Sequence, residues 1–147
     1  MMVLIIILIM IPVRVFADDP QMTKGEIVLH ISGLRNDNGM LRALLFQSSE
    51  GFPSDHTKSY ALKNVSLESD SVTITILDIP FENYAVSLLH DENSNGKMDT
   101  NWIGLPKEGV GVSNNVKSKL GPPKYKDAKF KHDSKKLLLN IEMNYFF

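Results

Sequence analysis

Apolar and polar residues alternate with a period of two through much of this chain, and no long stretch shows the period of a helix. Residues 25–32, 71–77 and 137–143 show the alternation most clearly, and in the first of them Ile27 and Leu29 lie on one face. Such a pattern is typical of strands that bury one face and expose the other. The chain is therefore expected to fold as an all-β protein.

Turn signals divide the alternating stretches into short segments. The sequence Asn36-Asp37-Asn38-Gly39 separates strand 25–32 from the apolar strand 40–46 and predicts a hairpin between them. Further strands are expected at residues 59–67, 71–77, 84–89, 128–132 and 137–143. About seven short strands with turns between them predict an antiparallel β-sandwich, either immunoglobulin-like or transthyretin-like. No glycine-rich turn leads from a strand into a helix, which argues against a nucleotide-binding α/β fold.

Length, charge and cysteine content narrow the classes of function. The 147 residues are enough for one domain with a real core. A net charge of −1 argues against a nucleic-acid-binding protein with a broad basic face. The chain has no cysteine, which removes disulfides, thiol catalysis and zinc–thiolate sites from consideration.

The first seventeen residues have the pattern of a secretory signal peptide. Residues 1–13 are apolar throughout, and small residues at Val15 and Ala17 fit a cleavage site after Ala17. The apolar run is shorter than the roughly 20 residues that a transmembrane helix needs, although an uncleaved anchor is the alternative. We expect a mature domain of residues 18–147, located in the periplasm or outside the cell, with no integral membrane domain once the peptide is removed.

One long segment, residues 91–123, breaks the alternation and is rich in glycine, proline and asparagine. Loops of this length in a compact domain are usually functional or disordered. The segment begins with the pattern D-x-N-x-N-G-x-x-D, directly after the expected strand 84–89. Oxygen-bearing side chains at alternate positions, with a glycine for the sharp turn, are the ligand pattern of a calcium loop.

The pattern predicts a Ca²⁺ site with modest affinity. Gly96 stands at position six of the twelve-position calcium scheme, but Trp102 occupies position twelve in place of a bidentate glutamate, and Glu108 is a possible additional ligand. A metal-free loop, in which Asn and Asp side chains bond to their own backbone, is the open alternative. The ligand positions one, three, five, seven and nine are matched by Asp91, Asn93, Asn95, the Lys97 carbonyl and Asp99.

The residues around this loop resemble the signature of a bacterial family known as domain of unknown function 2141. The family pattern runs H-D-x-N-x-N-G-x-x-D-x-N and then G-x-P-x-E-G-x-G-x-S-N-N. Here it is matched from His90 to Asn101 and from Gly104 to Asn115, and Leu34-Arg35-Asn36 before Gly39 is also similar to the family. Asn83 and Val112 depart from the pattern. The resemblance implies an exported all-β domain and implies no established activity.

Trp102 and Ile103 are the expected partner-binding residues of the long loop. An exposed tryptophan there would bind a cell-envelope protein or a glycan. The more ordinary interpretation is a hydrophobic plug that folds the loop back onto the sandwich, because Ile103 and Leu105 adjoin Trp102.

No catalytic constellation emerges from the residue spacing, so the protein is expected to be non-enzymatic. Two other classes remain open. One is a carbohydrate-active enzyme or other hydrolase whose carboxylates lie beside the long loop. The other is a metal-free ligand-binding module that uses Trp102. A histidine at the end of a strand more often joins a polar network than binds a metal, so His90 is expected in such a network.

Overall fold

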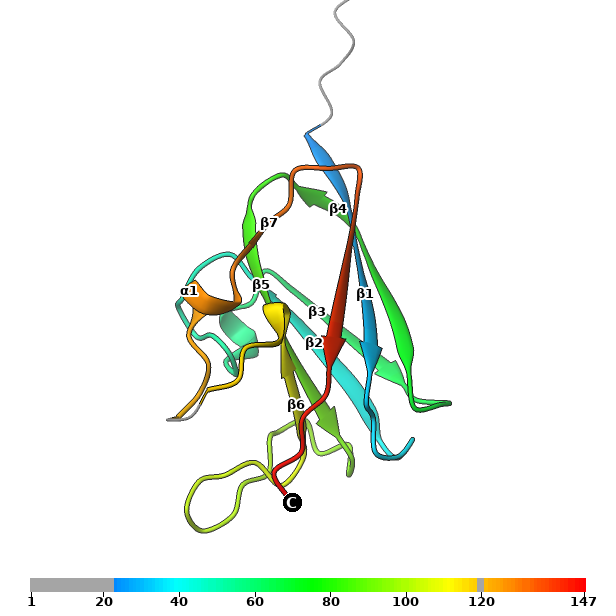
Figure 1. Cartoon of the computed structure of the whole chain (residues 1–147), viewed down its shortest axis with the longest axis vertical. Coiled ribbons are helices and arrows are strands. Elements are labelled where there is room, and N and C mark those ends of the chain that lie inside the picture. The colour runs from blue at the N-terminus through cyan, green and yellow to red at the C-terminus, as the bar shows by residue number, and fades with distance from the viewer. Residues whose placement is uncertain (1–22, 119–120) are drawn as a thin grey trace, which may run out of the picture.

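The computed structural model describes residues 23–118 and 121–147, so the expected signal peptide lies outside the described residues. In this part of the chain two β-sheets pack face to face (Figure 1). The strands are β1 (Lys24–Ser32), β2 (Met40–Phe46), β3 (Ala61–Ser66), β4 (Val72–Pro80), β5 (Asn83–Asp91), β6 (Gly109–Val112), β7 (Phe130–Lys131) and β8 (Lys136–Glu142). Short helical turns are η1 (His56–Lys58), η2 (Ser113–Asn115) and α1 (Tyr125–Ala128).

One sheet has the strand order β4-β1-β8, and the other has the order β3-β2-β5-β6, with β7 added to β5. The all-β sandwich predicted from the alternation is confirmed. Most strand pairs are antiparallel, but β1 and β8 are parallel, which a purely antiparallel sandwich does not include. The described part of the chain contains no helix that is both long and apolar enough to cross a membrane.

The core lies between the sheets and is built by the alternating residues. On β1 the inward side chains are Ile27, Leu29 and Ile31, all fully buried, as the period of two predicts. A strand with one apolar face can bury it only against another element, and here each sheet supplies that surface for the other. The partners include Leu41, Leu45, Ile74, Ile76, Tyr84, Val86, Leu88 and Ile141.

Strand β5 is buried on both faces along part of its length. Its outward residue Ala85 packs with Val112 and Ala128 in a second small cluster, against Phe52 and Tyr125. The short helix α1 and the loop after β2 therefore cover the outer face of the larger sheet at this point. This central position of β5 fixes the place of its last residues, from which the Asp/Asn-rich loop begins.

The predicted hairpin between residues 25–32 and 40–46 is wrong. These segments are β1 and β2, and they lie in different sheets. Strand β1 is the middle strand of its sheet, with both edges occupied by β4 and β8. The connection of residues 33–39 crosses between the layers with Leu34 buried, and it is longer than the two to five residues of most hairpin loops.

Two further expectations for the second half of the chain need correction. The long excursion of residues 91–123 contains a strand, β6, which pairs with β5. Its sequence Gly-Val-Gly-Val lacks the large side chains that make a strand stand out in a sequence. The strand expected at residues 128–132 is shortened to β7, because Ala128 ends the one-turn helix α1.

Candidate functional site

The loop between β5 and β6, residues 92–108, projects from the end of the sandwich at which the chain ends (Figure 1). It starts from Asp91, the last residue of β5, which is fully buried. The backbone N–H of Asn95 donates to Asp91 Oδ1 at 3.0 Å, and that of Gly96 donates to Oδ2 at 2.7 Å. Gly96 has a φ of 78°, which glycine adopts at little cost. The Asp91 carboxylate therefore holds the turn in place.

The next polar residues form two further turns of the same kind. Asn93 Oδ1 accepts from the Asn95 N–H at 3.1 Å, and Asn95 Oδ1 accepts from the Lys97 N–H at 2.8 Å. Both Asn side chains also donate to the Asp99 carboxylate, Asn93 Nδ2 at 2.7 Å and Asn95 Nδ2 at 3.2 Å. The structure thus brings Asp91, Asn93, Asn95 and Asp99 into one hydrogen-bonded cluster, with Lys97 in the same turn.

The sequence leaves open whether this cluster binds a cation or is a metal-free system of turns. In the described residues no group of three or more His, Cys, Asp or Glu side chains gathers as a metal site. The cluster has two carboxylates, and its other side-chain oxygens belong to the Asn93 and Asn95 amides. Each oxygen that accepts one N–H keeps a second lone pair. The amide donors on Asp99 already offset part of its charge, so a cation at the cluster would compete with them.

Glu108 closes the loop from its far end. Its side chain is buried, and its two oxygens accept from the backbone N–H groups of Glu92 and Asp99, each at 3.0 Å. Burial raises the pKa of Glu108, the charges of Asp99 and Asp91 add to that effect, and the two amide bonds oppose it. Glu108 thereby joins the first and last parts of the loop.

The loop is attached to the preceding connection, residues 33–39, by an ion pair that the sequence analysis did not identify. Arg35 Nε donates to Glu92 Oε1 at 2.9 Å, and Asn36 Nδ2 donates to the same oxygen at 2.6 Å. The hydrogen bond from Arg35 is the main reason that the pKa of Glu92 lies below its usual value. The resemblance at Leu34-Arg35-Asn36 marked this segment, but it gave no sign that the segment touches the loop.

The Arg35–Glu92 ion pair should make the stability of the fold depend on pH. Because the pKa of Glu92 is lower in the folded protein than its ordinary value of 4.5, the pair contributes its full stabilisation at pH values above 4.5. This contribution is lost as the pH falls through the lowered pKa. We expect Glu92→Gln to cost about 1.5–3 kcal/mol at neutral pH, the usual value of a hydrogen bond to a charged group. The difference from the unchanged protein should vanish at acid pH.

Urea unfolding at a series of pH values measures this difference. Glu68→Gln, at an exposed glutamate outside the loop, is the matched control and should change little at any pH. The pKa of Glu108 is raised, so its effect on stability has the opposite pH dependence to that of Glu92. Because the unchanged protein and both variants contain Glu108, this effect cancels in the comparison. A Glu92→Gln penalty that is independent of pH would contradict the role assigned to the ion pair.

His90 lies in a polar network, as expected. It is fully buried, and its Nε2 is 2.8 Å from the Asn38 carbonyl oxygen, which assigns the proton to Nε2 as the donor. Its Nδ1 then accepts from the Tyr145 hydroxyl at 2.7 Å. The Tyr145 oxygen itself accepts from the Arg35 N–H at 3.2 Å. His90 therefore links the end of the chain, the connection 33–39 and the end of β5.

The loop tip, residues 101–105, carries the expected partner-binding residues. Trp102 is 95% exposed and Ile103 is 56% exposed, so the plug that would fold the loop onto the sandwich is wrong. The tip is the end of an arm, residues 99–107, in which Thr100 pairs with Pro106. This arm holds the tryptophan away from the apolar core.

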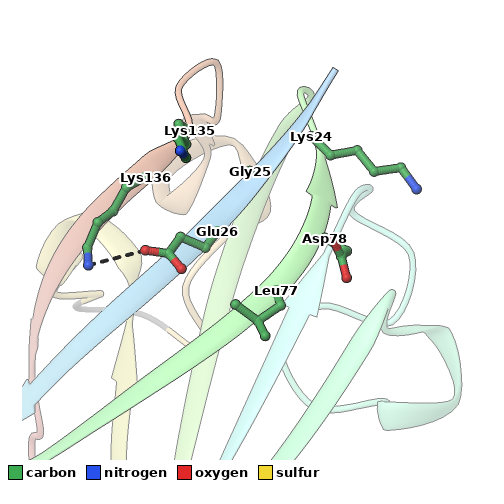
Figure 2. Close-up of a pocket in the computed structure, with 7 residues that line it drawn as sticks. All are labelled: Lys24, Gly25, Glu26, Leu77, Asp78, Lys135 and Lys136. Atoms are coloured by element: carbon green, nitrogen blue, oxygen red, sulfur yellow. Dashed lines mark ion pairs between the residues drawn. The ribbon is translucent and has the colours of Figure 1, made fainter. Parts of the chain in front are cut away.

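A surface hollow lies at the other end of the sandwich, beside the start of β1 (Figure 2). There Lys136 forms an ion pair with Glu26 at 3.2 Å, and Leu77 lies on the neighbouring strand β4. A second hollow is lined by residues 60–63 and 75–79. Neither hollow includes a residue of the β5–β6 loop, so neither is the pocket beside the loop that the hydrolase interpretation requires.

The fold and the loop define the class of this protein as a small all-β sandwich with an Asp/Asn-rich loop at one end. The model of a family described as an uncharacterized protein conserved in bacteria (DUF2141) matches residues 29–138. The match covers most of the sandwich and the whole β5–β6 loop, and the chain belongs to this family, as the resemblance implied. No curated protein and no solved structure matches the chain.

Proposed function

We propose that this protein is an exported, non-enzymatic β-sandwich whose β5–β6 loop binds calcium and presents Trp102 and Ile103 to a partner at the cell envelope. The observation that supports the proposal is the cluster of Asp91, Asn93, Asn95 and Asp99 at the base of an arm with an exposed tryptophan. Carboxylate and amide oxygens are the ligands that calcium takes in proteins.

The proposed affinity is modest because only two carboxylates are present. Sites with few charged ligands in extracellular modules bind calcium at about 10⁻⁴–10⁻³ M. Calcium would compensate the charges of Asp91 and Asp99 more completely than the N–H groups that now donate to these two carboxylates. Binding would therefore stabilise the folded loop and fix the arm that carries the tip.

A calcium titration of the chelator-treated protein tests the proposal. Calcium at ten times its dissociation constant should stabilise the fold by about 1.4 kcal/mol, which raises the melting temperature by about 3–6 °C. Trp102 is the only tryptophan, so its fluorescence reports the arm directly.

Asp99→Asn should remove this response, because it deletes a carboxylate that binds no backbone group in the loop through its side chain. The matched control is Asp70→Asn, at an exposed aspartate far from the loop in sequence, which should keep the full response. Magnesium at the same concentration should give a smaller shift, since it tolerates irregular loops poorly. An absent calcium response, or an equal one in Asp99→Asn, would refute calcium binding at the loop.

A further inference from the structure

We propose that the loop tip, residues 101–105, inserts into the interfacial region of an anionic lipid bilayer. This inference names the partner in the proposed function and rests on the proposed export of the chain. It does not require calcium at the loop.

The first observation is the composition and shape of the tip. Trp102, Ile103 and Leu105 of the tip are exposed, and so is Met98, four residues before Trp102 in the sequence. The loop that carries them projects from the end of the sandwich (Figure 1), and neither of the two surface hollows includes a residue of this loop. A convex apolar end with a tryptophan matches the membrane interface, where amphipathic aromatic rings are enriched and no complementary shape is needed.

The second observation is that the tip pairs four of its own backbone N–H groups. The Ile103 and Leu105 N–H groups both donate to Asn101 Oδ1, at 3.1 and 2.9 Å. The Gly104 N–H donates to the Asn101 carbonyl at 3.0 Å, and the Asn101 N–H donates to the Leu105 carbonyl at 2.9 Å. Unpaired N–H groups make the transfer of a loop from water to lipid costly. The N–H groups of Asn101, Ile103, Gly104 and Leu105 are already paired before the tip meets a membrane.

The third observation is the charge beside the tip. Lys97 and Lys107 are exposed, and the four ion pairs found in the described residues leave both of them out. The acidic residues of this region all have partners: Asp91 and Glu108 are buried and accept from backbone N–H groups, and Glu92 pairs with Arg35. Asp99 is half-buried and accepts from the Asn93 and Asn95 side-chain amides. The exposed charged side chains next to the tip are therefore Lys97 and Lys107, and they complement anionic headgroups.

These observations favour a bilayer over the other occupants. A stable protein interface takes about 20–30 residues on each side, and a tip of five residues offers much less. A small ligand or sugar is normally held in a concave site with converging polar groups, whereas the polar groups of this tip are directed to its own backbone.

Vesicle binding tests the inference. The chain starting at Asp18, which contains every strand that the structure describes, is sedimented with vesicles of phosphatidylcholine alone or of an equimolar mixture with phosphatidylglycerol. We expect binding to the anionic vesicles, a blue shift of Trp102 emission, quenching by lipids brominated on the acyl chains, and weaker binding at high salt.

The decisive comparison uses two double variants. Trp102→Ser with Ile103→Ser should lower the partition coefficient at least about tenfold, the expected loss for a large apolar side chain. The matched control is Leu77→Ser with Leu138→Ser, at leucines that are 63% and 56% exposed on the three-stranded sheet, and it should bind as the unchanged protein does. Both variants should have the same melting temperature as the unchanged protein.

Each measurement is made with chelator and with calcium, while melting is followed separately. Vesicle binding without a calcium-dependent melting shift would refute the calcium site and leave the lipid inference standing. A melting shift without vesicle binding would do the reverse. The lipid proposal would be overturned if the Trp102→Ser, Ile103→Ser variant still bound the vesicles. It would also be overturned if the protein bound envelope glycans or proteins through the tip and did not bind vesicles.

Discussion

The substitution Gly39→Ala should destabilise the fold by about 2–5 kcal/mol, the sum of a left-handed backbone cost and an overpacking cost. Gly39 has a φ of 67° and lies directly before β2. A Cβ there would overlap the Asp91 carbonyl oxygen and would stand 2.7 Å from the carbonyl carbon of Glu92. Both neighbours are backbone atoms at the start of the β5–β6 loop, so neither can turn away as a flexible side chain would.

Gly104→Ala separates the two costs. Gly104 has a similar φ of 82°, but a Cβ there would meet no atom within 4 Å. We expect it to lose only the conformational part, about 1–2 kcal/mol. Urea unfolding of both variants gives the difference, which measures the close approach of residues 33–39 to the loop. Equal losses in the two variants would show that the backbone relaxes at Gly39 and that the contact is not tight.

The period-two alternation predicted the strands well because burial of one face is a local property of the sequence. The segments 25–32, 71–77 and 137–143 correspond to β1, β4 and β8, with the expected residues facing inward. The same pattern does not say which strands share a sheet. A strand with one apolar face can bury that face from either sheet. The hairpin predicted for β1 and β2, which follow one another in the sequence, is therefore wrong although both strands are correct.

The site was predicted only as far as its residues are consecutive. The turn at Asp91–Asp99 depends on local bonds between Asn, Asp and the backbone, and such bonds can be anticipated from spacing. The contacts of Arg35 with Glu92, and of Tyr145 with His90, join residues that are far apart in the chain. No periodicity or motif spacing carries this information, because it depends on the order of strands in the two sheets.

Local reasoning could not decide between an exposed Trp102 that binds a partner and a buried Trp102 that plugs the loop onto the sandwich. An apolar run such as Trp102-Ile103 predicts burial if the chain can fold back onto its core. Here Glu108 and the Thr100–Pro106 pairing hold the arm in an extended course away from the sandwich. The arrangement of the arm, and not the composition of the tip, decides that these side chains meet solvent.

Two fully buried histidines offer a matched test of how much the site network stabilises the fold. His90 has hydrogen-bond partners at both ring nitrogens, Asn38 and Tyr145. We expect His90→Leu to cost about 2–4 kcal/mol, because it leaves the Asn38 carbonyl and the Tyr145 hydroxyl with unpaired bonding capacity. The calcium response that we propose for the loop should weaken in the same variant, since His90 precedes Asp91 directly.

His132 supplies the control. It is equally buried, but neither of its ring nitrogens has a hydrogen-bond partner among the described residues, and it packs against the ring of Phe81 at 5.2 Å between centroids. His132→Leu should therefore leave the free energy of unfolding unchanged or raise it by about 1 kcal/mol. Because both variants replace a buried imidazole with the same side chain, their difference in unfolding free energy isolates the hydrogen bonds of His90. Equal losses in the two variants would mean that packing, and not the network, sets the contribution of His90.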